Sequence, residues 1–581
     1  MSRMLESLAH RGSVERMELA PGITLGVRTT PSLPEELGSG QPFLRGGRWF
    51  VFDGRIDDRI ALVSRLGLEV RRPDVELAAT VFERLGLDGF RDVLGSFVLL
   101  VIDPKAGEIS MIRDPLGGRT LFFAVSDAVM LVGSEEVALL AGGVARELDE
   151  VRLAQHFAAA VPGASRTFFR RIKELEPGQV LSVTAQTFRS RRFVALSPAR
   201  MAALSDGELA EAFRERLDVA VADRMRTLGT GAALSGGLDS SSVVALAHRR
   251  DAELKTFSWT FRELLECDER PYIEAMVEAL ELDATWIEGD DCGPLADPAT
   301  WPIDPSTPLT NPYVRLKQRV YRAARAAGVR ALLTGIDGDA LYTGVEEWLV
   351  DLVSERGVRA GISGVWAHLK RHGVSAVASP SMRRAFRVPV FRKKKPGAWL
   401  TPEAVRLVLG SRSSEEGGDD VRRPEQGRAL RQRVPKMAAL GYAQGLREGI
   451  EILVPFRDRR IIEFILAVPA HQLYGTSGYK HVLRSAMCGF LPEVVRRAGR
   501  HGTLEALFRK GIERERGLVA DVLGHPEPEL LQYVDGAWLS RAFSGGPAPE
   551  VVDYVAWQCF SFLLWVRAIR NINGAGAETF C

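Results

Sequence analysis

The sequence predicts a protein of mixed class, with an α+β unit at the amino-terminal end and an α/β unit after it. Up to about residue 195, short apolar or alternating runs such as GRWFVFDGRI and GSFVLLVID are separated by Gly, Asp and Pro turns, which favours a β-rich domain punctuated by helices. After about residue 205, a few apolar strands alternate with long amphipathic helices, which is typical of a parallel sheet covered on both faces. The remainder of the chain is expected to be largely helical.

Composition places few limits on function. The 581 residues include 76 Lys and Arg against 74 Asp and Glu, so the net charge of +2 gives no case for a nucleic-acid or membrane partner. Five cysteines are scattered without metal-ligand spacing, and we expect reduced thiols in a soluble, cytoplasmic protein that has no secretory signal. The late apolar stretch VVDYVAWQCFSFLLWVRAI is broken by Asp553, Gln558 and Arg567, so we expect a buried helix there and no membrane span.

One span, residues 381–433, differs from its surroundings. It contains the basic run RRAFRVPVFRKKKPGAW and the run GSRSSEEGGDDVRRPEQGR, which is polar, rich in Gly and poor in apolar residues. This composition is typical of a solvated, partly disordered surface loop. The alternative is a mobile cover that becomes ordered when a substrate or partner binds.

The stretch GAALSGGLDSSSVVALA, residues 231–247, indicates an anion site. A strand-like run ends in a Gly-rich turn, and a helix-like run follows, so glycines and free N–H groups at a helix start meet at one place. Asp239 would repel a phosphate unless a divalent cation such as Mg²⁺ lies between them. The alternative, a serine-capped helix after a flexible turn, accounts for one Ser and one Gly only. The residues expected to bind the nucleotide are Ala233, Ser235, Gly236, Gly237, Asp239, Ser240 and Ser241, with the turn from Ser235 to Ser241 at its phosphates.

The motif SGGLDSS resembles the pyrophosphate-binding loop of the ATP-pyrophosphatase family in its asparagine synthetase form. KTFSWTF is similar to the second strand of that family, which implies that Trp259 lies beside adenine. ALLTGIDGDALYTG is similar to the segment SGxGxDExFxGY, which implies Gly335 in the adenosine pocket and Asp339 as a second metal carboxylate. The resemblance implies a HUP-like synthetase domain over residues 205–575, with ATP and Mg²⁺ as its cofactors.

Two further stretches imply the catalytic groups. YKHVLRSAMCGFLPEVVRRAGRHGT resembles KxxLRxAxxxxLPxxxxxRxKxGF, and an ungapped count puts Lys480 on its first lysine and Arg500 on its catalytic lysine; a gap would move that match to Lys510. Arginine keeps the charge but cannot lose a proton, so a role in stabilising phosphate charge survives the exchange. GIEILVPFRDRRIIEFILAVP resembles GLExRxPFLDxxLVEFxxxLP, in which Glu451 either orients the amine or accepts its proton, or forms a salt bridge beside the pocket.

The first half of the chain resembles the glutaminase domain of class II amidotransferases through LAHRG, FDGRIDD, GSFVLLVID, RDPLGGRTLFF and GSEEVALL, in that order. This implies a degenerate Ntn-hydrolase-like β-sandwich, layered with helices, over residues 1–195. The family nucleophile is an N-terminal Cys, which we expect to be missing because the chain starts Met-Ser-Arg. Asp53 replaces the oxyanion-hole asparagine, and its charge would oppose an oxyanion. We expect a scaffold or docking domain in which His10 and Arg11 are structural remnants.

Relatives with a disabled glutaminase half include the β-lactam and carbapenam synthetases and the lasso-peptide cyclases, which join a carboxylate to an amine of the same molecule through an acyl-adenylate. The β-lactam type has a tyrosine in the Gly-x-Gly segment, where this chain has Ile336. A primary α-amine, with a pKa of about 7.7–8.0, needs little help to lose a proton. We therefore favour lasso closure between a peptide N-terminus and an Asp or Glu side chain.

Three alternatives stay open: a β-lactam-type synthetase, an ammonia-using asparagine synthetase homologue, and a catalytically inactive scaffold. The scaffold is disfavoured because the candidate metal and phosphate ligands are all present. The lasso resemblance implies a precursor core peptide as substrate, with a leader-binding protein and a leader peptidase as partners. No nucleic-acid or membrane partner is expected.

Overall fold

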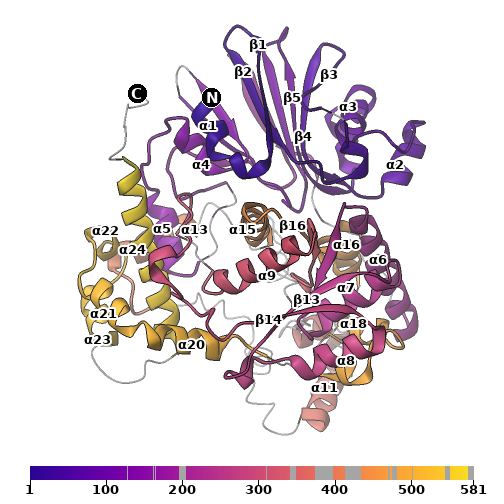
Figure 1. Ribbon diagram of the computed structural model, residues 1–581, viewed down its shortest axis with the longest axis vertical. Coiled ribbons are helices and arrows are strands. Elements are labelled where there is room, and N and C mark those ends of the chain that lie inside the picture. Colours follow the sequence, from indigo (N-terminus) through magenta and orange to yellow (C-terminus); the bar gives the residue numbers. More distant parts are fainter. Residues whose placement is uncertain are drawn as a thin grey trace.

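The structure is a computed structural model of the full chain. It describes residues 1–38, 40–126, 129–160, 163, 165–194, 196, 204–308, 311–339, 348–372, 397–412, 434–468, 472–473, 480–499, 502–543 and 550–573. A β-rich half lies at the top of Figure 1, and a parallel sheet surrounded by helices lies below it. The predicted mixed α/β fold class is confirmed.

The amino-terminal half is built on an antiparallel sheet of six strands. In spatial order these are β11 (Phe188–Arg192), β10 (Gln179–Val183), β6 (Glu108–Arg113), β5 (Gly95–Asp103), β4 (Arg48–Ile56) and β3 (Phe43–Arg45). Two smaller sheets are formed by β1 (Ser13–Ala20) with β2 (Ile23–Thr29), and by β8 (Met130–Gly133) with β7 (Phe122–Val125) and β9 (Lys173–Glu174). The α-helices of this half are α1 (Ser2–Ser7), α2 (Arg59–Leu66), α3 (Asp74–Leu85), α4 (Glu136–Ala141) and α5 (Glu150–Phe157).

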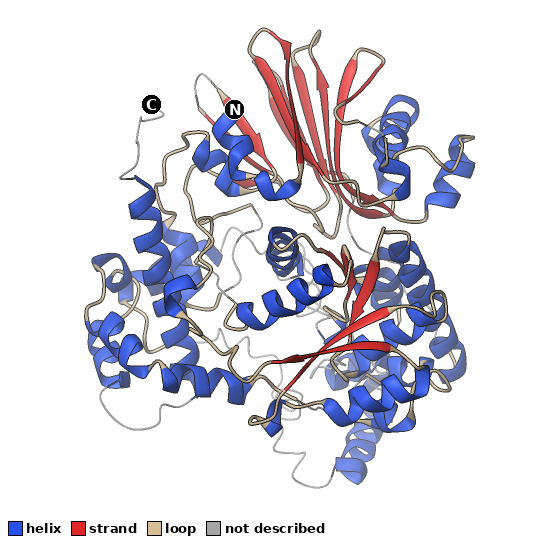
Figure 2. Ribbon diagram, viewed as in Figure 1, coloured by secondary structure: helices blue, strands red, loops and turns tan. Residues whose placement is uncertain are grey.

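The period of two along β5 explains the layers of this half. Phe97 and Leu99 pack toward helices α2 and α3, whereas Val98 packs on the other face, where β7 and β8 lie. The hairpin of β1 and β2 packs near the same second face, through Leu25 and Val27 against Ile102. The sheet is therefore covered by helices on one side and by smaller sheets on the other, as Figure 2 shows.

The second half contains the predicted parallel sheet. Its five strands, in spatial order, are β14 (Asp283–Glu288), β13 (Lys255–Thr260), β12 (Thr230–Ala233), β15 (Ala331–Leu333) and β16 (Glu451–Leu453), and every pair is parallel. The helices of one face are α6 (Asp206–Met225), α7 (Leu238–His248), α8 (Arg270–Leu280), α16 (Arg459–Ala467), α18 (His481–Ala486) and α19 (Glu493–Arg497). On the opposite face lie α9 (Val314–Ala326) and α15 (Val434–Arg447).

Local signals account for the start of this half. Helix α6 begins at a capping box, in which Ser205 Oγ accepts from the backbone N–H of Glu208 and the Glu208 carboxylate accepts from the backbone N–H of Ser205. The central strand β12 and its neighbours β15 and β16 are short and largely buried, as expected of a sheet covered on both faces, whereas the edge strand β14 is mostly exposed. The carboxyl ends of β12 and β15 meet at one edge, where the candidate site lies.

Most of the helical remainder packs against the amino-terminal half. The helices in contact with it or with one another there are α13 (Pro402–Arg412), α20 (Glu505–Arg514), α21 (Arg516–Gly524), α22 (Pro528–Leu531), α23 (Gly536–Phe543) and α24 (Glu550–Asn573). Helix α11 (Trp348–His372) lies apart from them, at the bottom of Figure 1. One hydrophobic cluster unites α5 with α13 and α24, and in it Phe157 contacts Phe562 edge to face. Trp399 Nε1 also donates a hydrogen bond to the Phe157 carbonyl oxygen at 2.9 Å. The two halves thus share a core.

The late apolar stretch is a helix whose central residues are buried, as predicted. Among the described residues, no helix has the length and apolar character that a membrane crossing requires. Within the span 381–433, the structure describes residues 397–412, and these include α13, whose Ala404 and Val408 are buried in the shared core. This part of the expected loop is a helix, because its apolar residues recur at helical spacing. The rest of that span lies outside the described residues.

Candidate active site

The Gly-rich turn after β12 is organised by its own side chains. Ser240 Oγ accepts a hydrogen bond from the Ser235 backbone N–H at 3.1 Å and lies 2.9 Å from Ser235 Oγ and 3.1 Å from the Gly237 carbonyl oxygen. Gly236 has a left-handed backbone, φ 77°, which favours glycine. Ser240 therefore shapes the turn, and the N-terminal N–H groups of α7 are presented at its inner edge.

The turn that follows β15 lies directly on the first turn of α7. A Cβ at Gly335 would come within 2.5 Å of the Ser240 backbone nitrogen and 2.9 Å of Asp239 Cβ. A Cβ at Gly338 would come within 2.3 Å of Asp239 Cγ. Both positions require glycine for this close approach. Gly335 was predicted at the site, whereas Gly338 was not, although both glycines of TGIDGDA were visible in the sequence.

Lys480 joins the two predicted metal carboxylates. Its Nζ lies 2.5 Å from Asp239 Oδ2 and 2.7 Å from Asp339 Oδ1. Burial would lower the pKa of Lys480, but the two carboxylates outweigh burial and raise it. Burial raises the pKa of Asp239 to about 6, an effect that Lys480 opposes and Asp339 reinforces. With all three groups ionised, the cluster carries one more negative than positive charge, so it can accept a further cation.

Two buried polar atoms at this turn fit a phosphate and a metal. Asp239 Oδ1 and Ser241 Oγ have no hydrogen-bond partner among the described residues. An unsatisfied buried polar group costs about 1–3 kcal/mol, so both atoms point to a ligand. The described residues contain no group of three or more His, Cys, Asp or Glu side chains suited to a metal ion. A Mg²⁺ ion held by Asp239 and Asp339 would therefore complete its shell with phosphate oxygens, as Mg²⁺ typically does.

The other predicted nucleotide residues lie at the same edge of the sheet. Ala233 is the last residue of β12, and Trp259 lies near the carboxyl end of β13 in register with Ile287. Trp259 is partly buried and packs against two apolar clusters that contain Phe257 and Phe261. Their positions suit the adenosine end of a nucleotide, since ligands of open parallel sheets bind outside the carboxyl ends of the strands.

Glu451 lies farther from the carboxyl ends of the strands than the other predicted site residues. It is in register with Ala331, the first residue of the three-residue strand β15, so it lies about 7 Å from the carboxyl end of that strand. Its Oε1 accepts from Arg119 Nη2 of the amino-terminal half at 2.5 Å. Of the two roles predicted for Glu451, the salt bridge is present, although its partner comes from the other half of the chain.

The two candidates for the catalytic cation have different outcomes. Arg500 lies outside the described residues. Lys510 is half-exposed on α20, and its Nζ lies 2.5 Å from Glu263 Oε2. This pairing gives Lys510 no contact with Asp239 or Asp339.

Sequence reasoning missed a second ion pair beside the site. Arg457, at the end of the 3₁₀ turn Pro455–Arg457, donates to Asp337 Oδ2 through Nε at 2.8 Å and lies 2.5 Å from it through Nη2. Asp337 has a left-handed backbone, φ 71°. The pair therefore fixes the turn that carries Gly335 and Gly338. The PFRDRR run after β16 was the available signal.

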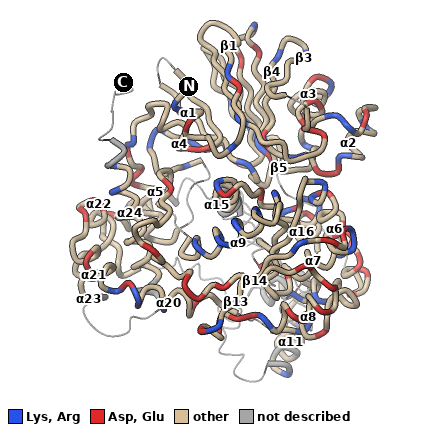
Figure 3. The backbone as a smooth tube through the Cα atoms, viewed as in Figure 1, with Lys and Arg blue, Asp and Glu red and all other residues tan. Residues whose placement is uncertain are grey.

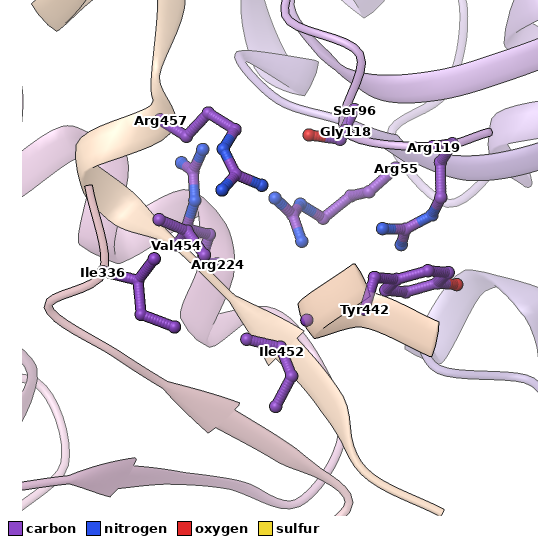
Figure 4. A pocket seen from close by; sticks show the side chains of 11 residues that line it. Arg55, Ser96, Gly118, Arg119, Arg224, Ile336, Tyr442, Ile452, Val454 and Arg457 are labelled. Atoms are coloured by element: carbon purple, nitrogen blue, oxygen red, sulfur yellow. The ribbon is translucent and has the colours of Figure 1, made fainter. Parts of the chain in front are cut away.

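A small cavity, partly open to solvent, lies between the two halves. Figure 4 shows the guanidinium groups of Arg55, Arg119, Arg224 and Arg457 around it, with the Tyr442 ring against Arg119. These arginines are paired with acids behind the wall; Arg55, for example, lies 2.7 Å from Asp57. Burial alone would raise the pKa of that carboxyl, but Arg55 and Arg224 outweigh burial and lower it.

The cavity adjoins the candidate nucleotide site. Ile336, which directly follows Gly335, lines it together with Ile452 and Val454 of the neighbouring strand and loop. Ile336 contributes a hydrocarbon surface without a proton acceptor. Figure 3 shows that basic and acidic residues are interspersed over the described parts of both halves.

The fold and the site define a class of protein: a parallel sheet with helices and a Gly-rich turn before a helix, preceded by a layered β-rich domain of the Ntn type. The comparisons with known proteins specify the class. The chain belongs to the asparagine synthase family, whose model matches residues 212–567, and residues 1–194 match the glutamine amidotransferase domain.

Several curated relatives are similar over part of their length. The chain is 25% identical to the amidase chry2 of Gibberella zeae, over 60% of this chain and 56% of the relative. It is 24% identical to the glutamine-hydrolyzing asparagine synthetase 1 of Bacillus subtilis, over 37% of this chain and 35% of the relative. It is 31% identical to the carboxyethyl-arginine beta-lactam-synthase of Streptomyces clavuligerus, over 36% of this chain and 39% of the relative. The chain thus spans less than two thirds of these relatives.

Proposed function

We propose that the protein is an ATP-dependent ligase that forms an amide bond through an acyl-adenylate and releases AMP and pyrophosphate. The observation that carries this proposal is the convergence of Asp239, Asp339 and Lys480 at the first turn of α7, beside an unsatisfied Ser241 hydroxyl. Membership of the asparagine synthase family supports it.

In the proposed reaction, a substrate carboxylate attacks the α-phosphorus of ATP, and the bond to pyrophosphate breaks. The turn from Ser235 to Ser241 binds the leaving pyrophosphate through backbone N–H groups and the Ser241 hydroxyl. A Mg²⁺ ion bound with ATP would neutralise phosphate oxygens beside the two aspartates. Lys480 holds those aspartates in place. An amine then attacks the acyl carbon, AMP leaves with the bonding electrons, and the amine proton passes to a base or to solvent.

We further propose that both reacting groups belong to one peptide, so that the product is a macrolactam of the lasso type. Two features support this. Ile336 offers no proton acceptor beside the site, which suits a primary α-amine that is partly neutral at neutral pH. Asp53, in the oxyanion-hole position of the glutaminase resemblance, is paired with Arg11 at 2.9 Å, which argues against glutamine as the source of the amine. A leader-binding protein and a leader peptidase remain proposed partners.

The test uses the purified full chain, ATP, Mg²⁺ and a panel of synthetic peptides, each with a free N-terminal amine and one Asp or Glu at a varied distance. We expect one peptide to lose the mass of one water while AMP and pyrophosphate appear in equal amount. An N-acetylated copy of that peptide and an Asp239→Asn variant are the controls, and neither should give the product. If aspartate with ammonia, or a small β-amino acid, is consumed and every peptide is unchanged, the macrolactam proposal is wrong. If no carboxylate releases pyrophosphate, the protein is a scaffold.

A further inference from the structure

The motifs that resemble a glutaminase centre form a partly buried ion-pair cluster of His10, Arg11, Asp53, Arg119 and Glu135, here called the N-terminal polar cluster. His10 Nε2 and Arg11 Nε lie 2.8 Å and 2.6 Å from the same oxygen of Glu135, and Arg11 Nη1 lies 2.9 Å from Asp53 Oδ2. Arg119 Nε lies 3.4 Å from the other oxygen of Asp53. Both oxygens of Asp53 therefore face arginines, and the cluster is occupied by its own side chains.

A helix of the ligase half enters this cluster. The centroid of the Tyr442 ring, on α15, lies 3.8 Å from Arg119 Cζ and 5.9 Å from Arg11 Cζ. Two guanidinium groups of the other half therefore contact one aromatic ring. One turn later, Arg447 Nη2 lies 3.7 Å from Glu135 Oε2 and 2.9 Å from Asp304 Oδ2. The end of α15 is thus held by the amino-terminal half.

The same helix leads directly into the strand that carries Glu451. Only a short turn separates α15 from β16, and in it the Ile450 N–H donates to the Gly445 carbonyl oxygen at 2.9 Å. Arg119 then reaches across the interface to Glu451, and the side chains of both residues are at least nine-tenths buried. A single arginine therefore contacts Asp53 of its own half, the Tyr442 ring and the Glu451 carboxylate.

We propose that Arg119 is a positioning residue for Glu451 in the ligase reaction, and that the N-terminal polar cluster is the frame that fixes Arg119. Arg119 lines the cavity that Ile336 also lines, so the arginine end of the ion pair faces the cavity beside the candidate nucleotide site. In this role, Glu451 paired with Arg119 orients the attacking amine. Activation of the carboxylate takes place at the Gly-rich turn from Ser235 to Ser241. The inference rests on the proposed function, and it gives the glutaminase-like half a role that needs no glutaminase chemistry.

The first test needs no substrate. Arg119→Gln, Glu451→Gln and the double variant of the full chain are compared by thermal unfolding. We expect the loss of stability in the double variant to be smaller than the sum of the losses in the two single variants, because each single change leaves one buried charge without its partner. Arg226→Gln is the matched control, since Arg226 forms another ion pair between the halves, 3.1 Å from Glu35, and should be additive with Glu451→Gln. Additive effects for Arg119 and Glu451 would overturn the proposal.

The second test separates the two half-reactions. With the peptide that the wild type cyclises, its N-acetylated copy and hydroxylamine report carboxylate activation as a hydroxamate, because no internal amine competes. We expect Arg119→Gln to slow cyclisation about 100-fold while activation and the KM for ATP change less than about threefold. Arg119→Lys should recover part of the loss, since it keeps the charge without the fork geometry.

Equal slowing of both half-reactions, or of neither, would overturn the positioning role even if the wild type is active. A wild type that activates no carboxylate, peptide or amino acid, would instead refute the proposed function, and the positioning role would fall with it. Circular dichroism of each variant excludes loss of folding as the cause. The Arg226→Gln control should cyclise the peptide at the wild-type rate.

Discussion

Adding one methyl group at either glycine of the second turn tests how closely the site is built. A Cβ at Gly335 would lie 2.5 Å from the backbone nitrogen of Ser240, and a Cβ at Gly338 would lie 2.3 Å from the carboxyl carbon of Asp239. Ordinary van der Waals contact begins at 3.4 Å, so each methyl group comes about 1 Å too close. The two variants differ in what must move, which is helix backbone for Gly335 and a side-chain carboxylate for Gly338.

We expect Gly335→Ala to lower the free energy of unfolding by about 1–3 kcal/mol, because the turn and the first turn of α7 must separate. Gly338→Ala should cost less stability, since a carboxylate can rotate. Its rotation moves Asp239 about 1 Å away from Lys480, and a displacement of that size costs about 100-fold in turnover. Gly338→Ala should therefore keep the fold and lose the activity.

Thermal unfolding measures the first effect, and the rate of AMP formation together with the affinity for MgATP measures the second. Gly207→Ala is the control, because a Cβ at this helical position meets nothing within 4 Å. Wild-type turnover and nucleotide affinity in Gly338→Ala would refute the claim that the Asp239 carboxylate must keep its place. A Gly335→Ala variant as stable as Gly207→Ala would refute the packing of the turn on α7.

Three further predictions concern single side chains. Asp239→Asn and Lys480→Met should each lower the rate of AMP formation at least about 100-fold, because each removes a charge from the cluster expected at the phosphates. Near-normal rates would contradict the placement of Asp239 and Lys480 in the active site. Burial, with a smaller effect of Arg152, lowers the pKa of His156 from 6.5 to about 3, so the unfolded chain binds the proton more tightly. The contribution of neutral His156 to the free energy of unfolding should be fully present above pH 6.5, and the free energy should fall by about 2 kcal/mol from pH 7.5 to pH 5. In acid unfolding curves, His156→Gln should abolish this loss. Arg500→Lys should keep substantial ligase activity if the residue only stabilises phosphate charge, whereas complete loss would mean that its bidentate geometry is required.

The glycine–serine–aspartate turn was predictable because its geometry depends on neighbours in sequence. Ser235 and Ser240 bond to each other across five positions, and Gly236 needs a left-handed backbone whatever the rest of the fold does. The order of later motifs indicated which carboxylate and lysine belong to the same site. The apolar run GSFVLLVID likewise indicated a strand, and in β5 its successive residues are buried on opposite faces of the sheet.

Other features depend on contacts that no short pattern encodes. Gly338 is required only because a turn about one hundred residues after α7 packs on Asp239. Residues 402–412 fall inside the span expected to be a loop, yet they form a helix whose Ala404 and Val408 are buried where α5 and α24 come together.

The sequence by itself therefore determined the class of fold, the phosphate turn and the identity of the charged groups, since local backbone geometry and residue chemistry are properties of short segments. Only the tertiary structure decided which charges pair. Arg119 and Glu451 are separated by more than half of the chain and meet because two halves dock, and the cost of leaving a buried charge unpaired selects that arrangement.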